Sequence, residues 1–177
     1  MKITLLGFGG HAGNLIDICQ LRNYEIAGFI DDAANGQALP RLDAIEGSAV
    51  LGFGALSPEK LEDRYNTMLY SPAHFVTLTH PDAIISHCAM FGDGVQVMAG
   101  AIIQHNAQVD SGCIINTGAI IEHGSIIHKG CHIAPGAKVL GNCEIGAFSF
   151  IGAGAIIVQG SKLPPRSFIK AGSIWRS

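Results

Sequence analysis

The sequence has little charge and no long apolar run. Asp, Glu, Lys and Arg together make up 14% of the 177 residues, against about a quarter in an average soluble domain. No stretch of about 18 consecutive apolar residues occurs, so we expect no membrane-spanning helix. The first apolar run is short and leads into glycines, so we expect no signal peptide. A net charge of −3 disfavours a non-specific nucleic-acid binder.

The cysteines lack the spacing of a disulfide framework or a zinc ribbon. The chain has five of them, an odd number, and no C-x-x-C motif. Without an export signal, reduced thiols in the cytoplasm are the expected state. The five positions are Cys19, Cys88, Cys113, Cys131 and Cys143.

Charge is also divided unevenly along the chain. Residues 1–80 carry five Lys or Arg and nine Asp or Glu, whereas residues 81–177 carry six and five. The second part is therefore unusually poor in charge for a solvated surface. Burial of part of it between subunits is the simplest explanation.

A six-residue repeat dominates the second part and excludes an amphipathic helix, whose period is 3.6 residues. Every sixth residue from Ile85 to Ile169 is aliphatic or Phe, and the fourth residue after each of these is small, except Val95. The third is usually Gly or Asn, which tolerate the left-handed backbone of a tight corner. The pattern predicts short strands joined by corners, three to a coil of 18 residues, stacked at about 4.8 Å. Cys113, Cys131 and Cys143 fall on the small inward position, so we expect them to pack in the core.

The first part predicts a small Rossmann-like α/β unit over residues 1–80, followed by the repeat domain over 81–177. Expected strands cover 2–7, 25–32, 48–54 and 74–81, with helical patterns at 15–21 and 57–69. The sequence G-F-G-G-H-A follows the first strand, where glycines let a backbone approach a phosphate at a helix N-terminus. Asp31 and Asp32 end the second strand, where a carboxylate can bind ribose hydroxyls or a sugar amine. The unit is too small for a complete NAD site.

The motifs of both parts, G-G-H, D-D, I-I-N-T-G-A-I-I-E-H and H-I-A-P-G-A, resemble those of a known family. This family is the hexapeptide-repeat sugar O-/N-acyltransferases of bacteria, of the sialic acid O-acetyltransferase type, which include N-acetyltransferases for UDP-linked 4-amino sugars. The resemblance implies a left-handed parallel β-helix and transfer of an acetyl group from acetyl-CoA to a nucleotide-linked amino sugar in surface-glycan synthesis. It also implies a homotrimer with active sites between subunits, and no metal.

The resemblance assigns roles to individual residues by position. His123 matches the catalytic base, and a neutral imidazole suits removal of a proton from an attacking amine. Gly141 matches the glycine whose amide faces the thioester oxygen, where a fixed N–H stabilises an oxyanion. The residues implied for acetyl-CoA are His132, Gly141 and Ala153. Those implied for the nucleotide sugar are Gly9, Gly10, His11, Asp31, Asp32 and Gly54.

Two positions depart from the family pattern. The family usually has Asp or Glu directly after the base, to orient it, and this chain has Gly124 there. Glu122 precedes His123, but neighbouring residues of a strand point to opposite faces. The C-terminal segment is also shorter than the family's last coil and closing loop, which affects the expected grip on CoA.

Other functions stay open at this level. O-acetylation of a sugar or sialic acid is the closest alternative. His105, His123 and His128 have the spacing of an intersubunit zinc site of the γ-carbonic-anhydrase kind, where three histidines would activate a water. The N-terminal unit argues against that reading. A non-catalytic trimer that binds sugar nucleotides as a scaffold is the third possibility, and Gly124 is its main support.

Overall fold

The computed structural model describes residues 1–30 and 47–176. Its N-terminal unit is a four-stranded parallel sheet in the order β2-β1-β3-β4. Two helices of 12 residues each accompany this sheet, and no helix in the described residues is both long and apolar enough to cross a bilayer. The elements are β1 (Lys2–Leu6), α1 (Gly10–Leu21), β2 (Glu25–Ile30), β3 (Ser48–Leu51), α2 (Pro58–Leu69) and β4 (His74–Phe75).

These bounds refine the expected strands. The second predicted strand is seen to Ile30, and Asp31 and Asp32 lie outside the described residues. The third stops at Leu51 instead of continuing through residue 54, because the glycine-containing loop after β3 leaves the sheet toward the second part of the chain. The fourth divides into β4 and a first strand of the repeat.

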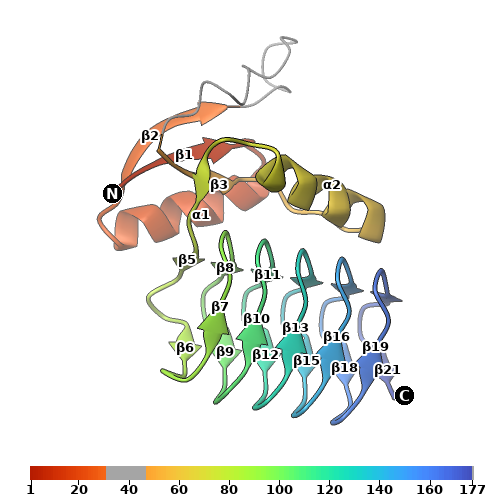
Figure 1. Ribbon diagram of the computed structural model, residues 1–177. Helices are drawn as coiled ribbons and strands as arrows, with labels where there is room; N and C mark the ends of the chain where they lie inside the picture. The colour runs from red at the N-terminus through yellow and green to blue at the C-terminus, as the bar shows by residue number, and fades with distance from the viewer. Residues whose placement is uncertain (31–46, 177) are drawn as a thin grey trace.

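The repeat region is a solenoid of two-residue strands in three parallel ladders (Figure 1). One six-stranded ladder, here the covered face, contains β5 (Leu78–Thr79), β8 (Gln96–Val97), β11 (Ile114–Ile115), β14 (His132–Ile133), β17 (Phe150–Ile151) and β20 (Phe168–Ile169). The second, the isoleucine face, contains β6 (Ile84–Ile85), β9 (Ile102–Ile103), β12 (Ile120–Ile121), β15 (Lys138–Val139), β18 (Ile156–Ile157) and β21 (Ile174–Trp175). The third, the mixed face, contains β7 (Met90–Phe91), β10 (Gln108–Val109), β13 (Ile126–Ile127), β16 (Glu144–Ile145) and β19 (Lys162–Leu163).

Strand partners are 18 residues apart, for example Ile114 with His132 on the covered face. The large residue of each hexad points inward, and most of these side chains are completely buried in one continuous core. The predicted register is therefore confirmed. The boundary expected after residue 80 stays a prediction, and the first solenoid strand is β5.

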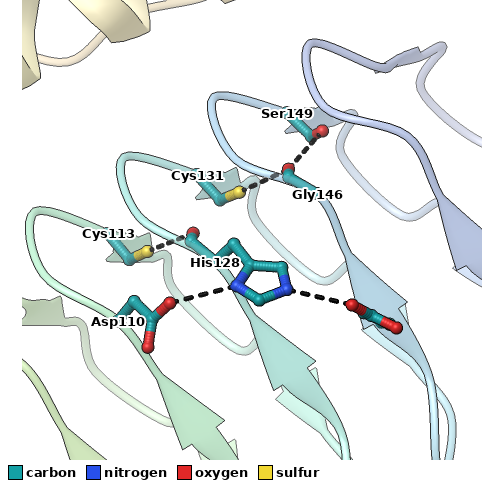
Figure 2. A network of polar contacts seen from close by, with 7 residues as sticks. Asp110, Cys113, His128, Cys131, Gly146 and Ser149 are labelled. Carbon is teal, nitrogen blue, oxygen red and sulfur yellow. Dashed lines mark hydrogen bonds and ion pairs between the residues drawn. The ribbon is translucent and has the colours of Figure 1, made fainter.

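Small polar residues inside the solenoid tie each coil to the next. Cys113 donates its thiol to the carbonyl of His128 at 3.1 Å, and Cys131 donates to that of Gly146 at 3.2 Å (Figure 2). Each partner lies 15 residues further along the chain, and Ser125 repeats the same bond to Leu140. All five cysteines are free thiols, and Cys113, Cys131 and Cys143 are buried, which confirms that they are core residues.

The corners use the left-handed backbone that the sequence predicted. Most carry Gly or Asn at a φ near +60° or +70°, the region that costs glycine least. Phe148 and Arg166 adopt the same conformation with φ of 59° and 61°. These two residues contact α2, so the corner conformation serves the packing of the N-terminal unit there.

Helix α2 runs along one edge of the solenoid, over successive corners between the mixed and covered faces (Figure 1). Met68 lies against Gly94, and Tyr65 lies against Gly112 and Gly130 of the next two coils. Tyr65 also makes an edge contact with Phe148, with ring centroids 5.6 Å apart. The Glu62 carboxylate pairs with Arg166 one coil further on. The N-terminal unit is thereby fixed to one side of the solenoid.

Candidate active site

The corner between the isoleucine and mixed faces, here the histidine corner, carries His87, His105 and His123 one above another. They are spaced by 18 residues, and all three are exposed in the single chain. Gly141 takes the same place in the next coil, and a Cβ there would lie 2.8 Å from Cε1 and Nε2 of His123. The imidazole therefore packs directly on the Gly141 backbone, and only glycine leaves it that space.

His123 has no hydrogen bond or ion pair from its side chain within the described part of the chain. The space beside Gly124 belongs to Asn142, whose Oδ1 would meet a Cβ at 2.5 Å. Gly124 also has a φ of +66°, where a larger residue would be strained. The position after His123, where the family has an acidic residue, thus holds the corner residue Gly124, and the Asn142 amide of the next coil lies over it.

His132 lies on the other side of the solenoid, on the covered face beneath the N-terminal unit. Its side chain is buried, and its Nδ1–H donates to the carbonyl of Ala55 at 2.8 Å. Its Nε2 then accepts from the Asn116 amide at 3.1 Å, since an amide nitrogen can only donate. Burial, followed by the positive charge of Arg64, lowers the pKa of His132 to about 4, so the ring is neutral at pH 7.

His11 follows the glycines at the start of α1 and reaches the covered face through Gln96. Its Nε2 lies 2.7 Å from Oε1 of Gln96, and Nε2 of Gln96 donates to the Leu51 carbonyl at 2.8 Å. Burial lowers the pKa of His11, so this ring is also neutral. Gly9 caps the helix without a side-chain bond, and a Cβ at Gly9 would find open space within 4 Å.

Arg64 joins the two parts of the molecule from within. It is 1% exposed, and donates from Nε to the Phe53 carbonyl at 3.0 Å and from Nη1 to the Gly112 carbonyl at 2.7 Å. Its Nη2 is buried without a partner in the described residues. Burial lowers the pKa of this guanidinium to about 10, which leaves it charged at neutral pH.

His128 is held between two carboxylates on the outer surface (Figure 2). Nδ1 lies 3.1 Å from Asp110, and Nε2 lies 3.1 Å from Glu144. The bond to Glu144 is the main cause that raises the pKa of His128, which favours the imidazolium form. A metal ligand must be neutral, so this geometry gives no support to a zinc site of His105, His123 and His128. Across residues 1–30 and 47–176, no three His, Cys, Asp or Glu residues are grouped to hold a metal ion.

The expected site residues therefore form two groups in one chain. His123 and Gly141 meet at the histidine corner, whereas His11, Gly54 and His132 lie around the seam between the N-terminal unit and the covered face. Ala153 is exposed at the corner between the covered and isoleucine faces. Figure 1 shows the N-terminal unit above the coils and strands β9, β12 and β15 at the opposite end of each coil. Within a single chain, the expected base His123 and the expected sugar pocket are not brought together.

Sequence reasoning missed three residues of the seam: Gln96, Arg64 and Asn116. A signal for Arg64 was present, because it shares a helical stripe with Leu61, Tyr65 and Met68 at i−3, i+1 and i+4. Gln96 gave no signal, since Gln108 occupies the same repeat position on the open mixed face.

Comparison with known proteins gives two family matches. Residues 2–66 match the PglD N-terminal domain, and residues 124–159 match the bacterial transferase hexapeptide family (six repeats). The curated proteins contain no significant match.

Solved structures match nearly the whole chain. The acetyltransferase domain of PglB from Neisseria gonorrhoeae FA1090 is 26% identical, with a TM-score of 0.87, over 99% of this chain and 91% of that one. Its complex with acetyl coenzyme A matches at 26% identity and a TM-score of 0.84, over 97% and 88%. A variant of perosamine N-acetyltransferase from Caulobacter crescentus, with CoA and GDP-perosamine, is 23% identical with a TM-score of 0.88, over 99% and 89%. The solenoid matches a left-handed β-helix, and the findings are consistent with the bacterial sugar acyltransferase family.

Proposed function

We propose, from a fold and family matches consistent with the bacterial sugar acyltransferases, that this chain moves an acetyl group from acetyl-CoA to the amine of a nucleotide-linked sugar. The matched structures that hold CoA, acetyl coenzyme A or GDP-perosamine support this donor and this class of acceptor. The observation that carries the proposal is the packing of the His123 imidazole on Gly141, because it places a base beside a backbone amide. No metal enters the reaction.

In the proposed mechanism, His123 is the catalytic base. The sugar amine attacks the thioester carbon while His123 takes its proton, and the carbonyl oxygen becomes an oxyanion. The Gly141 N–H has no backbone acceptor among residues 47–176, so it is available to donate to that oxygen. The tetrahedral intermediate then expels the CoA thiolate, which takes the proton from His123. From the resemblance, Ala153 and His132 also belong to the proposed acetyl-CoA site. Because the His132 ring is buried with both nitrogens bonded to Ala55 and Asn116, its part there is to hold these two residues in place.

The proposed sugar-nucleotide pocket lies at the start of α1. Gly9 and Gly10 leave open space, and the first turn of α1 carries no acidic residue that would repel a phosphate. Gly54 lies at the edge of the same region, on the loop fixed by Arg64. Asp31 and Asp32 stay part of the proposal, although they fall outside the described residues.

A homotrimer supplies what the single chain lacks. The isoleucine face exposes Ile84 and Ile174 by 64% and 60%, with Ile102, Ile120 and Ile156 partly exposed between them. Lys138, between Ile120 and Ile156, is the charged residue of this otherwise apolar strip. An apolar strip of this kind requires a cover, and it borders the histidine corner. A second copy on this face would bring its own sugar pocket toward His123 and could orient the unpaired ring. We place the protein in the cytoplasm, where acetyl-CoA and sugar nucleotides are made.

Product mass tests the reaction directly. The protein is incubated with acetyl-CoA and a panel of GDP-, UDP- and dTDP-linked amino sugars, with the matching hydroxyl sugars as controls for O-acetylation. We expect one sugar to gain one acetyl group, and His123→Ala to abolish the product while a chelator has no effect. Sugar binding without any acetylation would overturn catalysis and favour the scaffold alternative.

The assembly is tested by two matched variants. Ile120→Asp puts a charge on the isoleucine face, and Ile126→Asp puts the same charge on the mixed face one hexad later. We expect light scattering to give a monomer without transfer activity for the first and an active trimer for the second. A trimer in both variants would contradict the proposed interface.

A further inference from the structure

From the last residue of β3 into the loop that follows, every second carbonyl accepts a hydrogen bond from another part of the molecule. Leu51 accepts from Gln96 at 2.8 Å, Phe53 from Arg64 at 3.0 Å, and Ala55 from His132 at 2.8 Å. All three donors are buried, and two of them come from the covered face of the solenoid. The solenoid therefore determines where this part of the proposed sugar pocket lies.

Gln96 does more than hold the loop, because its two ends face different partners. The Leu51 carbonyl can only accept a hydrogen bond, so the amide nitrogen of Gln96 must face it. The amide oxygen then faces His11, at 2.7 Å from Nε2. Since that oxygen can only accept, Nε2 of His11 must carry the proton.

The tautomer of His11 follows from this chain of bonds. A neutral imidazole with its proton on Nε2 has a lone pair on Nδ1, which accepts hydrogen bonds. The titratable groups that act on this ring in the described residues are Arg64 from α2 and His132 from β14. Arg64 is a cation and His132 is neutral, so neither favours a charged His11. His11 thus presents an acceptor beside the glycines at the start of α1.

We propose that Gln96 is a positioning residue of the sugar-nucleotide pocket, which fixes His11 as the Nε2–H tautomer so that Nδ1 accepts a hydroxyl or amine N–H of the substrate. A phosphate oxygen has no proton to donate and is rejected at this atom. The helix N-terminus then binds the phosphates, and His11 accepts a hydrogen bond from the ribose or the sugar. This inference rests on the proposed function, because it names the part of that substrate which His11 contacts.

Two substitutions separate this role from a merely structural one. Gln96→Leu removes both bonds of the amide. Gln96→Glu keeps an acceptor for His11 but stabilises its imidazolium, in which both ring nitrogens are donors. Gln108→Glu is the matched control, because Gln108 has the same place in its hexad on the mixed face. A merely structural contact predicts similar losses in both Gln96 variants and no dependence on pH.

The first experiment measures calorimetric affinity, without CoA, for the GDP-, UDP- and dTDP-linked amino sugars between about pH 6 and 8.5. For the sugar that binds, we expect wild type and Gln108→Glu to change by less than about twofold, and Gln96→Glu to bind at least about tenfold more weakly at the acid end. A flat profile for Gln96→Glu, or tighter binding in acid as a phosphate contact requires, overturns the inference. Failure of every sugar to bind wild type overturns the proposed function together with it.

The second experiment tests Gln96 without any ligand or turnover. Long-range ¹⁵N–¹H spectra of histidine-labelled protein at about pH 7 distinguish the tautomers of each ring. We expect His11 with its proton on Nε2 and His132 with its proton on Nδ1. Gln96→Leu should give a mixture at His11 and leave His132 unchanged. His11 seen in wild type as the Nδ1–H tautomer or as imidazolium would overturn the inference even if the acetyl transfer is confirmed.

Discussion

Replacing Gly141 with Ala changes one methyl group at the proposed catalytic base. A Cβ at this position would lie 2.8 Å from both Cε1 and Nε2 of His123. Contacts this short are essentially never seen for real Cβ atoms. An ordinary contact needs 3.4 Å or more, so the ring must move by more than half an ångström. His123 is exposed and has no side-chain bond to resist this movement in the single chain.

We expect this substitution to lower kcat while it hardly changes the free energy of unfolding. A misplacement of about 1 Å in a catalytic group costs about 100-fold in rate, so we expect kcat to fall between about 10- and 100-fold. The backbone of Gly141 has no positive φ. Alanine therefore lowers the entropy of the unfolded chain, which offsets part of the new contact, and the unfolding free energy should change by less than about 1 kcal/mol.

The assay is acetyl transfer to whichever sugar the panel identifies, with thermal unfolding measured on the same samples. Gln159→Ala is the control, because Gln159 has the same corner position one coil beyond Gly141 and does not lie against His123. Wild-type kcat in Gly141→Ala would refute the argument, since the ring would then not depend on the space above Gly141. A large loss of stability would also refute it.

Three further predictions concern the seam and the core. The His132 ring has a pKa of about 4 in the folded protein against 6.5 when unfolded, so the unfolded state binds more protons between these pH values. The free energy of unfolding should therefore fall by up to about 3 kcal/mol as the pH drops from 6.5 to 4. In urea unfolding, His132→Gln should show a weaker dependence of stability on pH. Arg64→Met leaves the carbonyls of Phe53 and Gly112 without donors and should lower the unfolding free energy by about 2–4 kcal/mol, with Arg64→Lys in between; an unchanged urea midpoint would contradict this. Cys88 is the partly exposed cysteine, so mass spectrometry should find it alkylated first and the other four only after denaturation.

The solenoid could be predicted from the sequence because each of its coils repeats one local rule. A large residue points inward, a small one fills the corner, and Gly or Asn turns the chain; this pattern fixes the strand register without knowledge of distant contacts. The exceptions are Phe148 and Arg166, which take the corner conformation without being Gly or Asn. Their reason is the contact with α2, which no six-residue pattern contains.

The candidate site was less accessible to this reasoning. His123 and Gly141 could be paired in advance because the coil length places them in one column. The contacts of His11 and His132 could not, since they depend on how the N-terminal unit sits on the covered face. Gln96 and Gln108 illustrate the limit: both precede an inward Val, yet one is buried beneath the N-terminal unit and the other is on the mixed face. Only the tertiary arrangement distinguishes them.

The contact between α2 and the solenoid joins a short length of helix to a longer row of coils. From Met68 to Glu62 the helix rises about 9 Å, at about 1.5 Å per residue. The coils that these residues contact, from Gly94 to Arg166, advance about 19 Å, at about 4.8 Å per coil. The long side chains of Glu62 and Arg166 span much of the difference. Coils added beyond Ile169 would therefore leave the N-terminal unit in place, whereas an 18-residue coil inserted between Gly94 and Phe148 would separate Glu62 from Arg166. The solenoid can therefore accept added coils after Ile169, but not within the row of coils that α2 contacts.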